Sequence, residues 1–463
     1  MNQQEPIRDA KVLGMPKMLI LGLQHMFAMF GATILVPILV NSYFNGEGLS
    51  VQVTLICAGL GTLLFHVCSK FKVPAFLGSS FAFLGGFATV AELKAGKFAD
   101  MTYGEKLPYA CGGIVVAGLL YLALALIIKL VGVKRVMKFI PPVVTGPIII
   151  CIGLSLAPSA INNASTNWLL ALVALVVIIV FNIWGKGMFK IIPILMGVVI
   201  SYVLALILNA CGMTNPDGSA ILNFAGVSAA SWVGLPPFQI CKFDISAILV
   251  MAPIAIASMM EHIGDISAIS ATTGNNFLED PGLHRTLIGD GLATALAGMF
   301  GGPANTTYGE NTGVLELSKV YDPKVIRIAA VYAVVLSFIP KVAEIIGSLP
   351  SAIIGGVSFM LYGMISAIGV RNVVENKVDL TKSRNLIIAA VILVCGLGFS
   401  SGLTFNVGST SITLTGLALA AIFGILLNAI LPGNDYEFGK NPEGDQSRGI
   451  YVTPGFESEE KGE

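Results

Sequence analysis

Long apolar stretches follow one another along almost the whole chain, separated by short polar connections. Most are about 20 residues long, the length that an α-helix needs to cross a lipid bilayer. Only 12% of the residues are charged, whereas soluble proteins average about 25%. The pattern predicts an all-α polytopic membrane protein with fourteen spans. We place these spans near residues 17–41, 49–69, 74–92, 107–131, 137–160, 167–185, 190–212, 243–271, 284–301, 303–320, 325–347, 349–372, 384–401 and 411–432.

The basic residues are unevenly distributed between the two sets of connections. With fourteen spans, 22 of the 27 Lys and Arg residues fall on the side that holds both termini, and the other 5 fall on the opposite side. Cytoplasmic connections carry the excess of Lys and Arg in membrane proteins. We therefore expect both termini in the cytoplasm and a location in the cytoplasmic (inner) membrane of the cell. The polar segment 433–463 is expected to be a disordered cytoplasmic tail.

The sequence carries none of the usual marks of an enzyme or a nucleic-acid-binding protein. Its net charge is zero, so composition does not indicate a nucleic-acid partner. The seven Cys residues show neither paired nor metal-binding spacing. No Ser/His/Asp arrangement, metal-ligand spacing or phosphate-binding loop stands out. We expect no enzyme activity, no metal and no cofactor.

The two halves of the chain resemble each other. Seven spans precede the polar connection near 213–242 and seven follow it, so the second half enters the membrane from the opposite side as an inverted repeat. The segment 74–81 matches 303–310 in length and in its Pro followed by small and polar residues. In the fifth and twelfth spans, 141–146 matches 350–355 in the same way.

The third and tenth spans are interrupted by Gly, Ser, Thr and Pro. Irregular backbone at membrane depth is tolerated only where it is buried in protein or lines a cavity. We expect the stretches after Pro74 and Pro303 to pair as short antiparallel β-strands at the midplane, with helices resuming near Phe81 and Glu310. The N-termini of these two half-helices then direct free N–H groups into one cavity.

Carboxylates also occur within the spans of the second half. A charged group at bilayer depth costs roughly 2.5–3.5 kcal/mol, so Glu261 and Glu310 are treated as functional residues. Asp265 follows Glu261 by four residues and shares its helix face. A structural pairing of Glu261 with His262 is the alternative, and Asp290, between two Gly residues, is interpreted as a packing residue.

Carboxylate acceptors combined with backbone donors near Phe81 and Gly309 suit one kind of ligand. They fit a flat ring that carries both N–H and C=O groups. Uracil is such a ring, and so are xanthine and other oxopurines. The residues alone leave this choice open.

Five segments together resemble the nucleobase–ascorbate transporter family, and within it the bacterial uracil permeases. They are 24–33, 78–81, 261–264, 280–285 and 306–313. The last contains Glu310-Asn311, the uracil-type form of the family signature, in which the purine-type form has Gln-Asn. The resemblance covers about residues 21–432.

The resemblance implies a core domain and a gate domain, each assembled from both halves of the chain. The core is expected to comprise 1–135 and 243–347, and the gate 136–242 and 348–432. It also implies import of uracil with protons by alternating access, and often a homodimer formed through the gate domains within the lipid bilayer. A purine symporter for xanthine or urate with the same architecture is the main alternative.

The resemblance also assigns seven residues to the substrate site: two carboxylates, two backbone N–H donors and three lining residues. They are, in that order, Glu261 and Glu310, Phe81 and Gly309, and Ala32, Tyr308 and Tyr362. Uracil permeases often have a histidine where this chain has Asp265. The proton can therefore be carried by Glu261 alone or by a Glu261/Asp265 pair, and another coupling ion stays open.

Two other functions are weighed against nucleobase transport. An inorganic-anion transporter of the sulfate permease type is disfavoured, because two carboxylates in the site would repel an anion. A channel would let the substrate cross the membrane without accumulating it.

Overall fold

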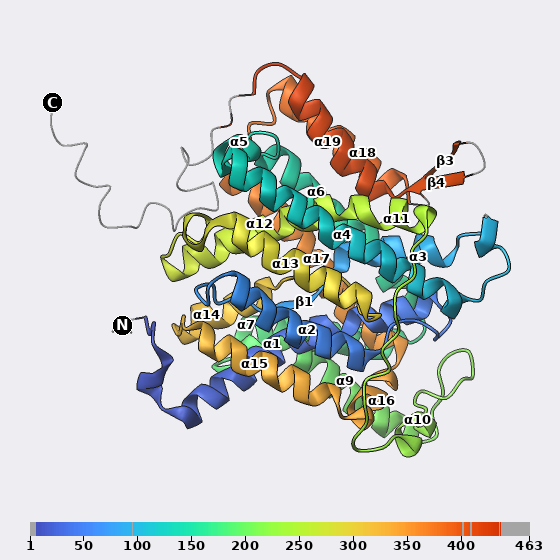
Figure 1. Ribbon diagram of the computed structural model, residues 1–463. Coiled ribbons are helices and arrows are strands. Elements are labelled where there is room, and N and C mark those ends of the chain that lie inside the picture. Colours follow the sequence, from blue (N-terminus) through green and yellow to red (C-terminus); the bar gives the residue numbers. More distant parts are fainter. Residues whose placement is uncertain (1–5, 95, 401, 408–409, 435, 437–463) are drawn as a thin grey trace.

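The computed structural model describes residues 6–94, 96–400, 402–407, 410–434 and 436. The predicted tail, 433–463, lies almost entirely outside them. The described part of the chain is built mainly of helices, most of which run side by side in one common direction (Figure 1). They are α1 (Met15–Tyr43), α2 (Val51–Cys68), α3 (Leu84–Ala91), α4 (Tyr103–Val131), α5 (Val133–Met137), α6 (Pro142–Ser165), α7 (Trp168–Trp184), α8 (Met188–Ile191), α9 (Pro193–Ala210), α10 (Ala225–Ala229), α11 (Ile245–Met251), α12 (Ala255–Thr273), α13 (Leu283–Met299), α14 (Gly309–Ser318), α15 (Pro323–Ser337), α16 (Pro340–Gly347), α17 (Ser351–Glu375), α18 (Ser383–Gly398) and α19 (Gly416–Ile430).

Within the described residues, seven helical stretches are long and apolar enough to cross a membrane. They are α1, α2, α4, α6, α9, α17 and the continuous stretch Ile245–Thr273, which joins α11 to α12. The helices α15 and α16 together make an eighth, but they are bent by 86°. The bend falls where Pro340 starts α16, because proline lacks the N–H that would continue the helix before it. Four shorter apolar helices accompany them, and the count of fourteen spans stays a prediction.

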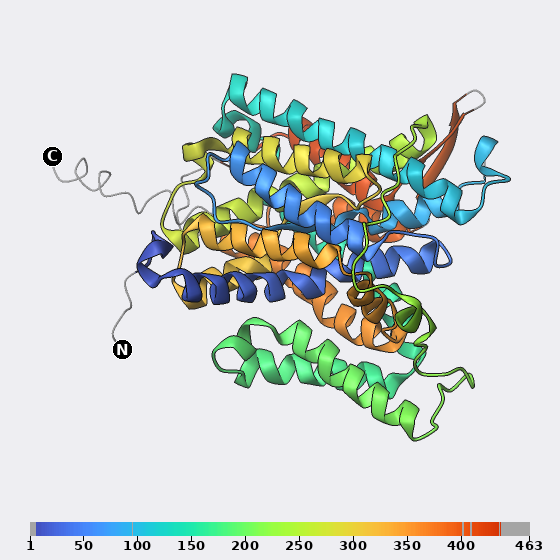
Figure 2. The same cartoon turned by 60° about the horizontal axis from the view of Figure 1, so that its bottom comes forward.

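The helices pack in two groups. In the first, α13 packs against α2 and α4, and α15 packs against α1 and α2. In the second, α6 packs against α17 and α18, and α7 packs against α9 and α17. Figure 2 shows α7 and α9, drawn in green, at one edge of the molecule. The helix α12 lies between the groups, because it contacts α4 and α13 on one side and α6 and α19 on the other.

The structure contains an antiparallel strand pair between the stretches that follow Pro74 and Pro303. Strand β1 (Leu77–Ser79) pairs with β2 (Asn305–Thr307) in the register Leu77↔Thr307, Gly78↔Thr306 and Ser79↔Asn305. Both strands are fully buried, so their outer edges need partners inside the protein. At the outer edge of β1, the Thr62 hydroxyl of α2 accepts a hydrogen bond from the Leu77 N–H at 2.9 Å. At the outer edge of β2, the Thr294 hydroxyl of α13 donates to the Asn305 carbonyl at 2.8 Å. A second pair, β3 (Leu403–Val407) and β4 (Thr410–Leu414), precedes α19.

The ring of Tyr308 packs directly on Gly78. A Cβ atom added to Gly78 would lie 2.4 Å from Cζ of Tyr308 and 2.7 Å from the Thr33 hydroxyl. The Tyr308 hydroxyl also donates to the Ser79 carbonyl at 2.9 Å, so the ring is held in place from two sides. Glycine at position 78 is therefore required by close approach.

We expect Gly78→Ala to lower the thermal unfolding midpoint of the purified protein. Overpacking a tight core costs about 1–3 kcal/mol, and both neighbouring side chains, Tyr308 and Thr33, are buried. Gly398→Ala on α18 is the matched control, because a Cβ there meets only a Val394 atom at 4.0 Å. Equal midpoints for the two variants would contradict the packing described for Gly78.

The segment before α1 is held by an ion pair and hydrogen bonds against the end of the bundle at which α1 begins. Asp9 pairs with Lys324 at 3.0 Å, and the hydrogen bond from the Lys324 ammonium holds the pKa of Asp9 below its usual range. Arg8 donates to the Thr273 carbonyl at 3.0 Å, at the C-terminus of α12. The C-terminal ends of α12 and α14 thus lie at the same end of the bundle as the N-terminal segment (Figure 1).

Candidate functional site

Three carboxylates come together where α12 passes β2 and the start of α14. Glu261 and Asp265 lie on the same face of α12, and Glu310 is the second residue of α14. The charge of Glu310 acts on both α12 carboxylates. Asp265 accepts a hydrogen bond from Thr307 at 3.1 Å, while Oε2 of Glu261 is buried without a hydrogen-bond partner among the described residues.

The N-terminus of α14 is open toward these carboxylates. Its N-cap residue, Tyr308, makes no side-chain capping hydrogen bond, so the first N–H groups of the helix stay available. Gly309 is exposed, and a Cβ atom there would meet only Oδ1 of Asp265, at 3.6 Å. The backbone donors of α14 and the carboxylate acceptors of α12 thus face the same space.

Phe81 starts a 3-10 turn, Phe81–Phe83, that leads into α3. Its N-cap residue, Ser80, makes no capping hydrogen bond to this turn and instead lies 3.3 Å from the Ser258 hydroxyl, one turn before Glu261 on α12. The Phe81 ring meets the ring of Tyr362 from α17 edge to face, with the centroids 6.1 Å apart. This contact links the turn before α3, a helix that packs against α4 of the first group, to α17 of the second group.

Two of the predicted lining residues are packed in the interior. Ala32 of α1 has no exposed surface, and Tyr308 is 4% exposed with its hydroxyl donating to strand β1. Phe81 and Tyr362 are also buried. The open surface belongs to other residues, which sequence reasoning did not single out: Ala268 on α12 and Gly313 on α14.

The exposed positions form one face on each of the two helices. On α12, Glu261 and Asp265 are partly exposed and Ala268 is exposed, and on α14 Gly309 and Gly313 are exposed. Spacings of three, four and seven residues keep these positions on one side of a helix. Both faces run from the carboxylates to the end of the bundle that carries the N-terminal segment. The spacing of Glu261 and Asp265 predicted the α12 face from the sequence, whereas the α14 face was not predicted.

His262 is fully buried and does not pair with Glu261, the alternative that the sequence left open. Its Nδ1 lies 3.2 Å from Oδ2 of Asp290 on α13 and 3.4 Å from the Thr307 hydroxyl.

Asn311, which belongs to the signature segment 306–313, has a structural contact. Its side-chain amide donates to the His25 carbonyl at 3.0 Å, and this hydrogen bond holds α14 against α1.

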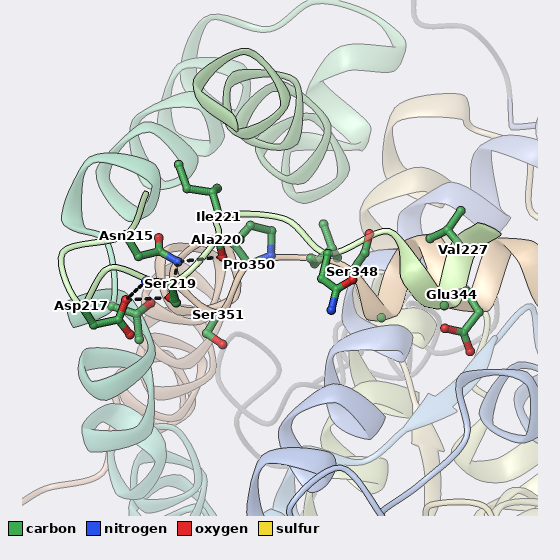
Figure 3. Close-up of a pocket in the computed structure, with 15 residues that line it drawn as sticks. Asn215, Asp217, Ser219, Ala220, Ile221, Val227, Glu344, Ser348, Pro350 and Ser351 are labelled. Atoms are coloured by element: carbon green, nitrogen blue, oxygen red, sulfur yellow. Dashed lines mark hydrogen bonds between the residues drawn. The ribbon is translucent and has the colours of Figure 1, made fainter. Parts of the chain in front are cut away.

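A cavity of about 510 Å³ lies away from the carboxylates, between the loop after α9 and the start of α17 (Figure 3). None of the predicted site residues lines it. Its two acidic residues, Asp217 and Glu344, lie at opposite ends in Figure 3. Asp217 accepts a hydrogen bond from the Ser219 hydroxyl of its own turn at 2.6 Å.

In the described part of the chain, no group of three or more His, Cys, Asp or Glu residues could hold a metal ion.

Comparison with known proteins identifies the family. Residues 16–405 match the family model described as "Permease family". The chain belongs to this permease family. It is 40% identical to the uracil permease of Bacillus caldolyticus, over 92% of this chain and 94% of that protein. The uracil permease of Bacillus subtilis is 41% identical, over 89% of this chain and 91% of that protein.

The family assignment confirms the resemblance found in the five segments, and it makes this permease an integral membrane transporter rather than an enzyme. Two solved structures share the fold. The transmembrane domain of a cyanobacterial bicarbonate transporter, BicA, has a TM-score of 0.59 at 18% identity and covers 86% of this chain and 98% of its own. The murine anion transporter Slc26a9 in its inward-facing state has a TM-score of 0.63 at 12% identity. This match covers 93% of this chain and 73% of the Slc26a9 chain.

Proposed function

We propose that this permease imports uracil with protons across the cytoplasmic membrane by alternating access. The observation that carries the proposal is the convergence of Glu261, Asp265 and Glu310 on the open N-terminus of α14. The uracil permeases that the chain resembles, at about 40% identity over most of its length, support the choice of substrate.

The chemistry of the site fits a uracil ring better than an anion. Uracil carries two ring N–H groups and two carbonyl oxygens. The carboxylates of Glu261 and Glu310 accept from the ring N–H groups, and the backbone N–H groups at Phe81 and Gly309 donate to the carbonyls. Three carboxylates in one partly buried space would repel an anionic substrate, which disfavours sulfate-type or bicarbonate-type transport.

The same three carboxylates provide a place for the coupling proton. Like charges that share a buried space cannot all be ionised, so at least one proton is held by the group as a whole. We assign this proton to Glu261 first, with Asp265 as its partner. Neutralising the site lowers the cost of moving it through the protein between the two sides of the membrane.

Alternating access needs one body that moves against another. We assign the core to 1–135 and 243–347 and the gate to 136–242 and 348–432, with the Phe81–Tyr362 ring contact on their boundary. The open faces of α12 and α14 lead to the end of the bundle that holds the N-terminal segment, which we assign to the cytoplasm. The conformation described here is then open inward. We also expect a homodimer formed through the gate.

Uptake into proteoliposomes tests this function. Labelled uracil is expected to accumulate above its external concentration when the outside is acidic, and a protonophore is expected to abolish the accumulation. Equilibration without accumulation, in buffers with or without a proton gradient, would identify a channel instead.

Competition separates the two candidate substrates. Excess unlabelled uracil is expected to block uptake, whereas xanthine and urate at the same concentration leave it nearly unchanged. Strong competition by xanthine at several pH values would favour the purine symporter, whose substrates offer the same N–H and C=O groups.

A further inference from the structure

A chain of buried polar groups leads away from the carboxylates into the interior. Thr307 of β2 donates to Oδ2 of Asp265 at 3.1 Å, and its hydroxyl lies 3.4 Å from Nδ1 of His262. The same nitrogen lies 3.2 Å from Oδ2 of Asp290. His262 and Asp290 have no exposed surface, and Thr307 is 1% exposed. The chain joins α12, α13 and β2, and its inner members are not among the predicted substrate-binding residues.

The hydrogen count sets the direction of these bonds. A threonine hydroxyl carries one hydrogen, and an ionised carboxylate only accepts. Because Thr307 donates to Asp265, its oxygen must accept from His262, so Nδ1 of the imidazole carries a hydrogen. Nε2 of His262 is buried without a partner among the described residues.

Asp290 favours this arrangement through its charge. Oδ2 of Asp290 lies at ion-pair distance from Nδ1 of His262, so the carboxylate attracts the hydrogen on that nitrogen alongside the Thr307 oxygen. A negative charge 3.2 Å from Nδ1 stabilises the hydrogen on that nitrogen. Asp290 therefore selects the form of the imidazole that donates to Thr307.

The environment of Asp265 makes this single donor important. The charged groups that act on its carboxyl are Glu261 on its own helix, Glu310 on α14 and Asp290 on α13, and all three are acidic. Thr307 is the one side chain that donates a hydrogen bond to Asp265 in the part of the chain that the structure describes. The hydrogen bond from this hydroxyl therefore favours the ionised form of Asp265.

We propose that His262 is a positioning residue, which orients the Thr307 hydroxyl toward Asp265 and is itself oriented by Asp290. This proposal depends on the proposed function in one respect, namely that Asp265 acts at the transport site. Thr307 also precedes Gly309 by two residues, so the same contact fixes the start of α14 relative to α12.

The test compares near-isosteric substitutions that keep or remove a donor. Asparagine places an amide nitrogen where His262 has Nδ1, so His262→Asn keeps the donor and His262→Leu removes it. Thr307→Ser keeps the hydroxyl, and Thr307→Val removes it with little change of shape. The variants are purified in full length, and each carries the same affinity tag.

The readout is the protonation of Asp265, followed by infrared difference spectroscopy of its carboxyl band during a pH titration. The band is assigned by its loss in Asp265→Asn, and no substrate is needed. A carboxylate that loses a donated hydrogen bond holds its proton to higher pH. We expect His262→Leu and Thr307→Val each to raise the midpoint by about one pH unit, a tenfold change in proton concentration. Their double variant is expected to shift it no further.

His262→Asn and Thr307→Ser are expected to stay within a few tenths of a unit of the unmodified protein. An unchanged midpoint in Thr307→Val, or fully additive shifts in the double variant, would overturn the positioning role. Because the titration contains no uracil, either result is separate from the proposed function, which is judged by uracil binding to the same preparations.

Discussion

Uracil binding is expected to fall about 10- to 150-fold when Glu310 is replaced by alanine, with the protein still folded. A hydrogen bond to a charged group contributes about 1.5–3 kcal/mol, and this range converts to the expected loss of affinity. Glu310→Ala also removes one of three acidic groups that repel one another, the others being Glu261 and Asp265. The free energy of unfolding is therefore expected not to fall. Equilibrium binding of labelled uracil to the purified variant measures the effect, and the thermal unfolding midpoint verifies the fold.

Glu261→Ala is expected to behave in the same way, because it removes the acceptor on the opposite helix. Glu316→Ala is the matched control. Glu316 lies on the same helix as Glu310, six residues further along, and is exposed. Normal uracil binding by both Glu261→Ala and Glu310→Ala would show that the site has been assigned to the wrong residues.

Transport is expected to fall about 5- to 150-fold in Gly313→Val, while uracil binding and stability are retained. Gly313 is exposed within α14, and nothing lies within 4 Å of a Cβ atom placed there. Glycine inside a helix costs about 1 kcal/mol relative to alanine, yet this conformation gives no packing reason for it. If the gate closes against the open face of α14, the added side chain obstructs only the closed state. A penalty of about 1–3 kcal/mol on that state reduces its population by about 5- to 150-fold.

The measurement compares uracil binding by the purified protein with uptake into proteoliposomes. Gly398→Val is the matched control, because Gly398 is also exposed in a helix with almost nothing near its Cβ position. This control is expected to bind and transport normally. Undiminished uptake by Gly313→Val would contradict closure against α14. Loss of binding or of folding in that variant would show that position 313 serves the structure.

The broken helices were predictable because their residues conflict with a continuous span. Pro74 and Pro303 each stand before small and polar residues that make a poor transmembrane helix, and the inverted repeat predicted that the two stretches would meet. The structure pairs β1 with β2 at these positions. The three carboxylates were equally visible, since an acidic residue in an apolar span has few harmless explanations.

The partners of buried polar groups could not be predicted, because they come from elements that are distant along the chain. His262 follows Glu261 in sequence, yet its close neighbours are Asp290 and Thr307, from α13 and β2. Helix periodicity says which face a residue occupies but not which element covers that face. Asn311 was visible in the signature, but its contact with α1 was hidden for the same reason.

The open surface of the site was also beyond sequence reasoning. The expectation that Tyr308 and Ala32 line the substrate site stays a prediction, and both residues are buried in this conformation. Gly313 and Ala268 are exposed instead, although neither type of residue signals a binding surface by itself. The bend between α15 and α16 was not predictable from hydropathy, because 325–347 is mainly apolar and Pro340 is its only proline.

The central claim is that uracil binds between α12 and the N-terminus of α14. An experimental density map of the purified permease with uracil tests it most directly. We predict density for one flat ring, with its N–H edges on Glu261 and Glu310 and a carbonyl directed at the Gly309 N–H. Density for uracil elsewhere, such as in the cavity between the loop after α9 and α17, with these carboxylates unoccupied, would contradict the account.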